Sequence, residues 1–162
     1  KQAISGFVLE YYQTTNQSGP MHGLDFSEVK KTGGADDYYN NDWYPGWVHW
    51  GMSMANPLIA SPIYNKDGDM TFKYNRVRAM HLGWSGDISS EWTYLAKLSY
   101  NKTWGTPFKP IPDILENFST FASIIYTPRK WKGWRFNASI AFDTGEIYGD
   151  NLGCQLKVRK IF

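Results

Sequence analysis

The chain has 162 residues, enough for one domain with a core of its own. Its mean hydropathy is −0.49, and no segment approaches the roughly 18 consecutive apolar residues of a transmembrane helix, which excludes a helical membrane protein. A formal charge of +2 without a long basic run argues against a nucleic-acid partner, and a single cysteine excludes an internal disulfide. A membrane β-barrel stays possible, because its strands face lipid only at every second residue.

Six segments alternate apolar and polar residues with a period of two, which is typical of β-strands with two different faces. In chain order they are residues 3–13, 70–84, 92–101, roughly 114–127, 134–143 and 152–159. The clearest is 134–143, where Trp134, Ile140 and Phe142 share one face with Phe136 and Ala138. The clearest segments have about ten residues, which fits the ~9–11 residues of a tilted strand that crosses hydrocarbon.

The connections between these segments fall into two kinds. Residues 85–90 and 128–133 are short and polar, whereas 14–69, 102–113 and 144–151 are longer. If the chain runs up and down, all short turns lie at one end and all longer loops at the other, which is the outer-membrane pattern. Six strands are too few to close a barrel, and an open edge in lipid leaves backbone groups unpaired. We therefore expect residues 1–162 to be the C-terminal segment of a larger antiparallel up-and-down transmembrane β-barrel.

Tryptophans gather near the short turns. Four of the eight are expected at this one level, namely Trp84, Trp92, Trp131 and Trp134. Tyr100, Trp104 and Phe142 are expected near the opposite end. Two aromatic belts at the two membrane interfaces account for this pattern, and a soluble β-sandwich is the main alternative fold.

Several short motifs resemble those of a known family. They are Asp37-Tyr38-Tyr39-Asn40-Asn41, Gly46-Trp47, Gly51, Asn56-Pro57-Leu58, Ser61-Pro62-Ile63-Tyr64-Asn65, Asn75-Arg76-Val77-Arg78-Ala79, Trp104-Gly105-Thr106 and Lys132-Gly133-Trp134. Together with the closing residues 153–162 they resemble the Wzi family of capsule assembly proteins, in the form found in Bacteroides and relatives. The resemblance implies a large barrel in the Gram-negative outer membrane that acts as a lectin for capsular polysaccharide, without catalysis and without a cofactor. Its expected partners are capsular polysaccharide and outer-membrane lipid.

The chain ends on an aromatic residue, Phe162, which resembles the outer-membrane sorting signal. Val158, Leu156 and Cys154 supply the apolar residues at alternate positions, whereas Lys160 departs from the pattern. This signal implies the barrel assembly machinery as a further partner.

The expected excursion at 14–69 is rich in aromatic residues and should therefore be folded. Its rings could stack on sugars or simply pack the loop against the barrel wall. Lys97, Arg135, Lys157 and Arg159 form a positive strip on the polar face, which suits an acidic polysaccharide unless carboxylates such as Asp143 and Glu146 balance it. The candidate polysaccharide-binding residues are Trp47, Tyr64, Asn65, Arg76, Arg78, Trp104, Arg135 and Asp143.

No motif indicates a catalytic or metal site. Asp67-Gly68 resembles part of a calcium loop, but a tight hairpin turn explains it better, because Ile63 and Tyr74 occupy the first and last ligand positions. The alternatives from other functional classes are a general outer-membrane porin or transporter segment and a soluble carbohydrate-binding β-sandwich or glycosidase domain. A glycosidase would need paired carboxylates in a cleft.

Overall fold

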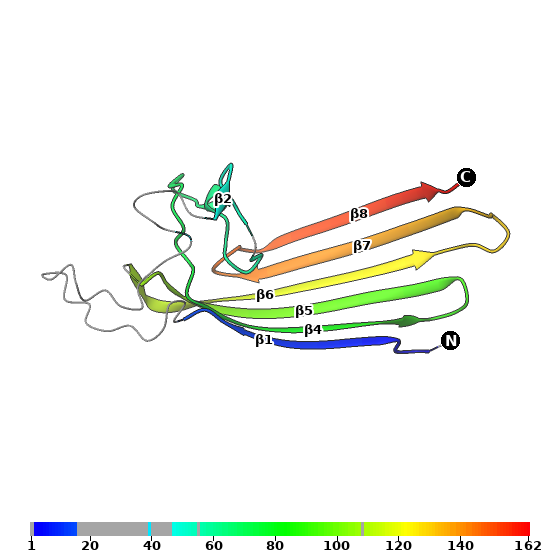
Figure 1. Cartoon of the computed structure of the whole chain (residues 1–162), viewed down its shortest axis with the longest axis horizontal. Helices are drawn as coiled ribbons and strands as arrows, with labels where there is room; N and C mark the ends of the chain where they lie inside the picture. The colour runs from blue at the N-terminus through cyan, green and yellow to red at the C-terminus, as the bar shows by residue number, and fades with distance from the viewer. Residues whose placement is uncertain (1, 16–38, 40–46, 55, 108) are drawn as a thin grey trace, which may run out of the picture. The chain divides into compact units, whose positions relative to one another are not determined.

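The computed structural model describes residues 2–15, 39, 47–54, 56–107 and 109–162, and in these residues the protein is all-β. One antiparallel sheet of six strands has the order β1-β4-β5-β6-β7-β8 (Figure 1). Its strands are β1 (Gly6–Gln13), β4 (Val77–Asp87), β5 (Trp92–Gly105), β6 (Pro110–Tyr126), β7 (Trp134–Gly145) and β8 (Asn151–Lys160). Among the described residues, no helix is long and apolar enough to cross a membrane.

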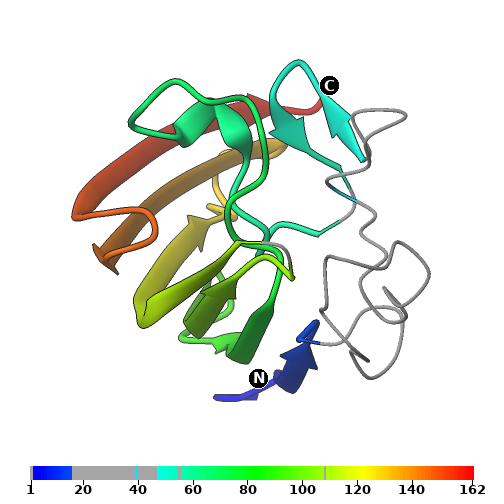
Figure 2. The ribbon, with the colours of Figure 1, turned by 90° about the vertical axis from the view of Figure 1, so that its left-hand side faces the viewer.

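The described residues between β1 and β4 form a small hairpin and one short helix. The hairpin pairs β2 (Val48–His49) with β3 (Met52–Ser53), and the helix is the 3-10 helix η1 (Pro62–Tyr64). Six strands are therefore confirmed in the main sheet, and β1 and β8 are its two edges, at opposite ends of the row of strands in Figure 2.

The described chain divides into two compact units. The strand unit comprises Lys1–Tyr11, Met80–Tyr100 and Asn117–Phe162, and the loop unit comprises Tyr12–Ala79 and Asn101–Glu116. In the strand unit, the connections after β4 and after β6 lie at the same end of the strands as both ends of the chain (Figure 1). This end is called the turn end below.

The prediction of a long loop at residues 102–113 is wrong. β5 continues to Gly105 and β6 begins at Pro110, so that only a short connection remains. Gly105 has φ +79°, and a Cβ there would lie 2.5 Å from the Lys109 carbonyl oxygen, so the turn requires glycine. The sequence pattern misses the end of β5 because the buried side chains there, Asn101 and Thr103, are polar.

Two other expected boundaries also shift. The strand expected at residues 70–84 begins only at Val77 and continues to Asp87. The connection expected at 144–151 shortens to residues 146–150, since β7 ends at Gly145. Of the three connections expected to be long, only the excursion between β1 and β4 is long in the structure.

The register of β6, β7 and β8 separates two faces of the sheet. Ile140 lies opposite Ala122 on one side and Cys154 on the other, and Phe142 lies opposite Thr120 and Leu152. The apolar face carries Ala122, Ile124, Tyr126, Trp134, Phe136, Ala138, Ile140, Phe142, Leu152, Cys154, Leu156 and Val158, and toward its ends also Phe118, Thr120, Thr144 and Lys160. The opposite face is mostly polar and carries Asn117, Ser119, Ser123, Arg135, Asn137, Ser139, Asp143, Asn151, Gln155, Lys157 and Arg159, together with Phe121, Ile125, Ala141, Gly145 and Gly153; it is called the polar face. The alternation expected for residues 134–143 and 152–159 is therefore confirmed.

The hydrophobic core formed by the described residues lies in the loop unit. Tyr39, Ile59 and Phe72 form its centre, and Val48 packs against them. No hydrophobic side chain of the strand unit is buried among the described residues, and Leu156 on the apolar face is 85% exposed. A sheet with so regular an apolar face and no described layer over it is unusual for a water-soluble protein.

Aromatic rings cluster at the turn end of the strand unit. Trp92 stacks on Tyr126 with ring centroids 4.4 Å apart, and Phe136 contacts both Trp131 and Trp134 at about 6 Å. The side chain of Lys160 lies over the Trp134 ring. Three of the four tryptophans expected at one level thus belong to one group of ring contacts.

Candidate functional site

The eight candidate residues all lie in the described part of the chain and are divided between its two units. Trp47 and Tyr64 belong to the loop unit and are 49% and 65% exposed. Arg135 and Asp143 belong to the strand unit and lie near opposite ends of β7. The candidate residues of each unit are therefore considered separately.

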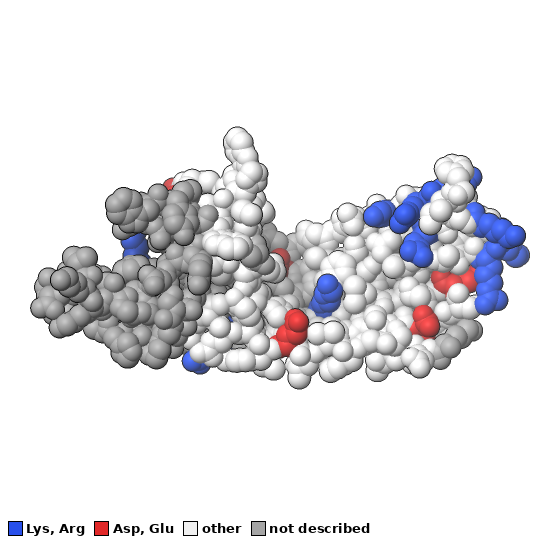
Figure 3. Space-filling model, viewed as in Figure 1, with Lys and Arg blue, Asp and Glu red and all other residues white. Residues whose placement is uncertain are grey.

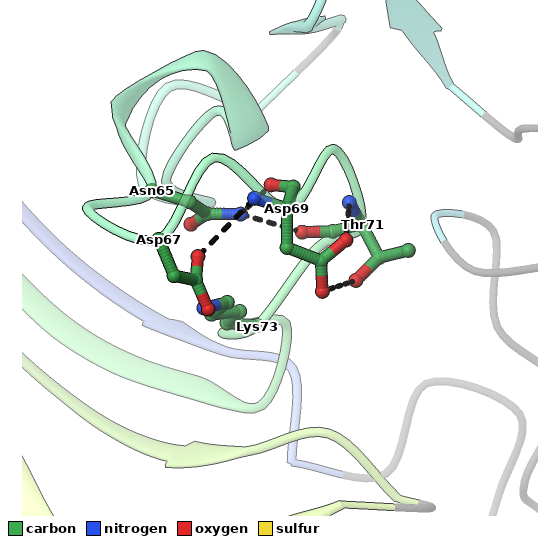
Figure 4. Close-up of polar contacts among 5 residues, drawn as sticks. All are labelled: Asn65, Asp67, Asp69, Thr71 and Lys73. Atoms are coloured by element: carbon green, nitrogen blue, oxygen red, sulfur yellow. Dashed lines mark hydrogen bonds and ion pairs between the residues drawn. The ribbon is translucent and has the colours of Figure 1, made fainter.

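Asn65 holds a turn through its side-chain amide. Its side-chain amide donates hydrogen bonds to the carbonyl oxygens of Asp69 and Thr71 at 2.6 and 2.8 Å (Figure 4). Its own carbonyl accepts from the backbone N–H of Gly68, whose φ of +73° suits a glycine. The turn at Asp67-Gly68 is confirmed, although η1, and not a strand, precedes it.

Both carboxylates of this turn already have partners inside it. Lys73 forms a hydrogen-bonded ion pair with Asp67, which lowers the pKa of that carboxyl, and Thr71 lowers the pKa of Asp69 by donating from its hydroxyl and its N–H. No group of three or more potential metal ligands occurs among the described residues. These contacts give Asp67 and Asp69 a structural role in the turn.

Arg78 and Trp104 come together in the loop unit. The Arg78 guanidinium lies 5.0 Å from the centre of the Trp104 ring, within the range of a cation–π contact. Arg78 is exposed and Trp104 is half-buried, so a ligand could reach both. The sequence suggested each residue alone but not their contact, because they lie on different strands.

Arg76 is tied into the fold more tightly than expected. Its carbonyl oxygen accepts hydrogen bonds from the N–H of Trp104 and the hydroxyl of Thr103, and its Nε donates to the Thr15 carbonyl at 3.3 Å. Its guanidinium therefore helps to fix the start of β4.

Asp143 lies near Tyr148, a half-buried tyrosine. In the sheet, Asp143 lies directly across from Asn151 on β8 and Ser119 on β6. Arg135 lies near the other end of β7. Burial raises the pKa of Tyr148 to about 12, and the negative charge of Asp143 adds to the effect. Asp143 therefore lies close to Tyr148 near one end of β7, far along the strand from Arg135.

Arg135 is part of a positively charged pocket. The pocket has a volume of about 240 Å³ and is lined by Ile125, Arg135, Asn137, Gln155, Lys157 and Arg159. Lys and Arg side chains gather at the turn end of the strands in Figure 3. Of the expected positive strip, Lys97 does not line the pocket and lies 6.0 Å from the Phe121 ring instead. The carboxylates of Asp143 and Glu146, expected to balance the strip, do not line it either.

Trp50 is one of the aromatic residues of the expected excursion, although it is not among the eight candidate binding residues. It sits at the tip of the β2–β3 hairpin, is 86% exposed and has φ +50°, a left-handed conformation that is uncommon for a bulky residue. The hairpin is anchored below the tip, since the Ile63 N–H donates to the Gly51 carbonyl and the Ser53 N–H to the Ser61 hydroxyl. A strained, exposed aromatic ring on a fixed support points to a binding role. The glycine of Trp50-Gly51, placed between two short apolar stretches, was the one sign in the sequence of a turn at this position.

The comparisons with known proteins add no relative: no family model matches the chain, and neither a curated protein nor a solved structure matches it. The resemblance to the capsule assembly family therefore stays a prediction. Four expected aromatic residues of the excursion, Phe26, Tyr38, Trp43 and Tyr44, lie outside the described residues.

Proposed function

We propose that the chain is the C-terminal part of a β-barrel in the outer membrane of a Gram-negative bacterium, and that this barrel binds and anchors capsular polysaccharide without catalysis. The observation that carries the proposal is the apolar face of β6, β7 and β8. Its side chains match row by row across three strands, and Ile140, Leu152 and Val158 on it are 51%, 71% and 60% exposed.

Lipid is the best cover for such a face. Burying one large aliphatic side chain contributes about 1.5–3 kcal/mol, so leaving a whole face in water costs many times that amount. A soluble sandwich would cover the face with a second layer of apolar side chains. The described hydrophobic core lies in the loop unit, so no second layer of this kind is available in the described residues.

The turn end supports a membrane interface there. Trp92, Trp131 and Trp134 gather around Tyr126 and Phe136 at this end, and Lys160 lies against the Trp134 ring. Amphipathic rings prefer the level of the lipid headgroups, and lysine can extend along such a ring so that its charge reaches water. In the proposed orientation the turn end faces the periplasm.

The edges of the sheet support a larger barrel. β1 and β8 are edge strands in the described sheet, and edge N–H and C=O groups in hydrocarbon each cost several kcal/mol. We therefore propose that further strands of the parent protein close the sheet between β8 and β1.

Polysaccharide binding is supported by exposed rings and cations in the loop unit. Trp47, Trp50 and Tyr64 expose aromatic surface, and Arg78 lies over Trp104. Aromatic faces stack on sugar rings, and arginine can donate several hydrogen bonds to sugar oxygens. The motifs that resemble the capsule assembly family lie largely in the same region.

The test uses the full-length protein. We expect it to fractionate with outer membranes and to show a heat-dependent mobility on gels, as folded membrane barrels do. Cells that produce it should retain capsule, and cells that lack it should shed capsule into the medium. A soluble protein would overturn the barrel and favour the sandwich lectin, whereas a membrane protein that conducts ions but retains no glycan would favour a porin.

A further inference from the structure

Three cations lie close together on the polar face of the strand unit, at its turn end. Arg135 lies directly opposite Arg159, and Lys157 occupies the next row on the same face, opposite Asn137. Like charges placed directly opposite each other on neighbouring strands destabilise a sheet. Within the described residues, no ion pair joins any of these three cations to an acidic side chain. The three side chains are exposed, and an anion bound among them would relieve their mutual repulsion.

The three cations surround a hollow. They line the pocket of about 240 Å³ together with Ile125, Asn137 and Gln155. The two amides can donate to and accept from hydroxyl groups, and the side chain of Ile125 offers a small apolar surface. The pocket thus combines strong positive charge with the neutral polar groups that sugar recognition uses.

We propose that this pocket binds the acidic substituent of a charged polysaccharide, a carboxylate or a phosphate ester on a sugar ring. The planar guanidinium groups of Arg135 and Arg159 match the two oxygens of such a group in a bidentate manner, and Lys157 adds a third charge. The pocket lies at the turn end, which faces the periplasm in the proposed orientation, so the glycan would reach it inside the barrel rather than at the outer loops. The proposal rests on the proposed function in taking capsular glycan as the source of the anion.

A sugar acid fits the pocket better than a lipid headgroup. The pocket lies on the polar face, whereas lipid would contact the opposite, apolar face. A lipid phosphate at the turn end would more readily meet Lys160, whose side chain lies beside the rings of Trp134 and Phe162.

The experiment measures binding to the full-length protein in detergent by calorimetry, with sodium phosphate, D-glucuronate and D-glucose as probes. We expect phosphate and glucuronate to bind and glucose to bind much more weakly. The double variant Arg135→Gln/Arg159→Gln should weaken glucuronate binding by at least about tenfold, since it removes two charge-assisted contacts. The matched control is Lys130→Gln/Lys132→Gln, which removes the same charge from the connection before β7 and outside the pocket; it should retain binding.

Thermal stability gives a second, independent reading. The substitution of two opposed arginines should leave the Tm unchanged or raise it, so loss of binding in the double variant cannot be attributed to unfolding. Phosphate should raise the Tm of the native protein and not that of the double variant.

Three results would overturn the proposal. They are unchanged glucuronate binding in the double variant, an equal loss in the control variant, and capture by phosphatidylglycerol vesicles that depends on Arg135 without binding of free glucuronate. If glucuronate binds as expected but cells lacking the protein retain their capsule, the pocket stands and the proposed function fails.

Discussion

Ile140 lies directly opposite Cys154 in the ladder of β7 and β8, in the middle of both strands. Both side chains are exposed, and Cys154 is a free thiol among the apolar residues Leu152 and Leu156. In the proposed barrel this row crosses the centre of the hydrocarbon, so it is the most sensitive place to test the membrane assignment.

Replacement of Ile140 by Arg should impair assembly. An arginine on the lipid face near the midplane costs about 2–4 kcal/mol, whereas the same side chain on the polar face can be solvated. The matched control is Ser139→Arg, one residue away on the polar face. The amount of heat-modifiable protein in outer membranes would measure both variants, and equal assembly of the two would contradict a lipid-facing Ile140.

Replacement of Trp50 by Asn should stabilise the hairpin and weaken glycan binding. Trp50 and Gly51 both have positive φ, and asparagine tolerates this conformation far better than tryptophan, which should gain about 1 kcal/mol. Loss of an exposed stacking ring should lower the affinity for capsular polysaccharide roughly tenfold, as expected for a contact worth about 1.4 kcal/mol.

The control for this change is Trp50→Phe, which keeps an aromatic face. Thermal unfolding and capsule retention would be compared in both variants. If Trp50→Asn binds glycan as well as Trp50→Phe does, the ring has no part in binding.

Deletion of Phe162 should slow insertion into the outer membrane several-fold. Its side chain is fully exposed and the Lys160 ammonium lies over its ring, so the deletion removes little packing from the sheet. Pulse-chase measurement of heat-modifiable protein tests this, and Phe162→Tyr, which retains a terminal aromatic residue, should insert at the native rate. An unaffected rate after deletion would remove the sorting role.

Alkaline pH should destabilise the strand unit through Tyr148. Its pKa is raised from 10.0 to about 12 in the folded protein, so between these values the unfolded chain loses a proton that the folded chain keeps. Stability from this side chain is complete below pH 10 and falls as the pH rises from 10 toward 12, by about 2–3 kcal/mol in total.

The variant Tyr148→Phe keeps the ring and removes the proton. Denaturant titrations at several pH values should therefore show a smaller alkaline loss of unfolding free energy in this variant than in the native protein. Identical slopes would mean that Tyr148 is not held in its neutral form by burial.

The sequence pattern located the strands well where each strand has one apolar face. Residues 134–143 and 152–159 alternate strictly, and the structure places β7 and β8 there with the expected faces. The pattern failed at residues 102–113, since the buried side of β5 is polar at Asn101 and Thr103. Periodicity of hydrophobic residues cannot detect a strand whose buried side chains are themselves polar.

The candidate site was predicted less well. The sequence could mark Arg78, Trp104 and Arg135 as suitable in chemistry, but the pairing of Arg78 with Trp104 joins residues from two strands. The strain at Trp50 is a backbone property, and no residue type reveals it in advance. Asn65 appeared available for a ligand only because its bonds to Asp69 and Thr71 depend on how the turn closes.

By itself, the sequence determined that this chain is built from amphipathic strands and which side chains share a face, because the side-chain direction alternates with a fixed period of two. The tertiary structure alone decided which strands are neighbours, and with that the opposition of Arg135 to Arg159 and the matching of Ile140 to Cys154. Register joins residues that are far apart in the chain, and it is set by the competition of all possible strand pairings rather than by any local preference.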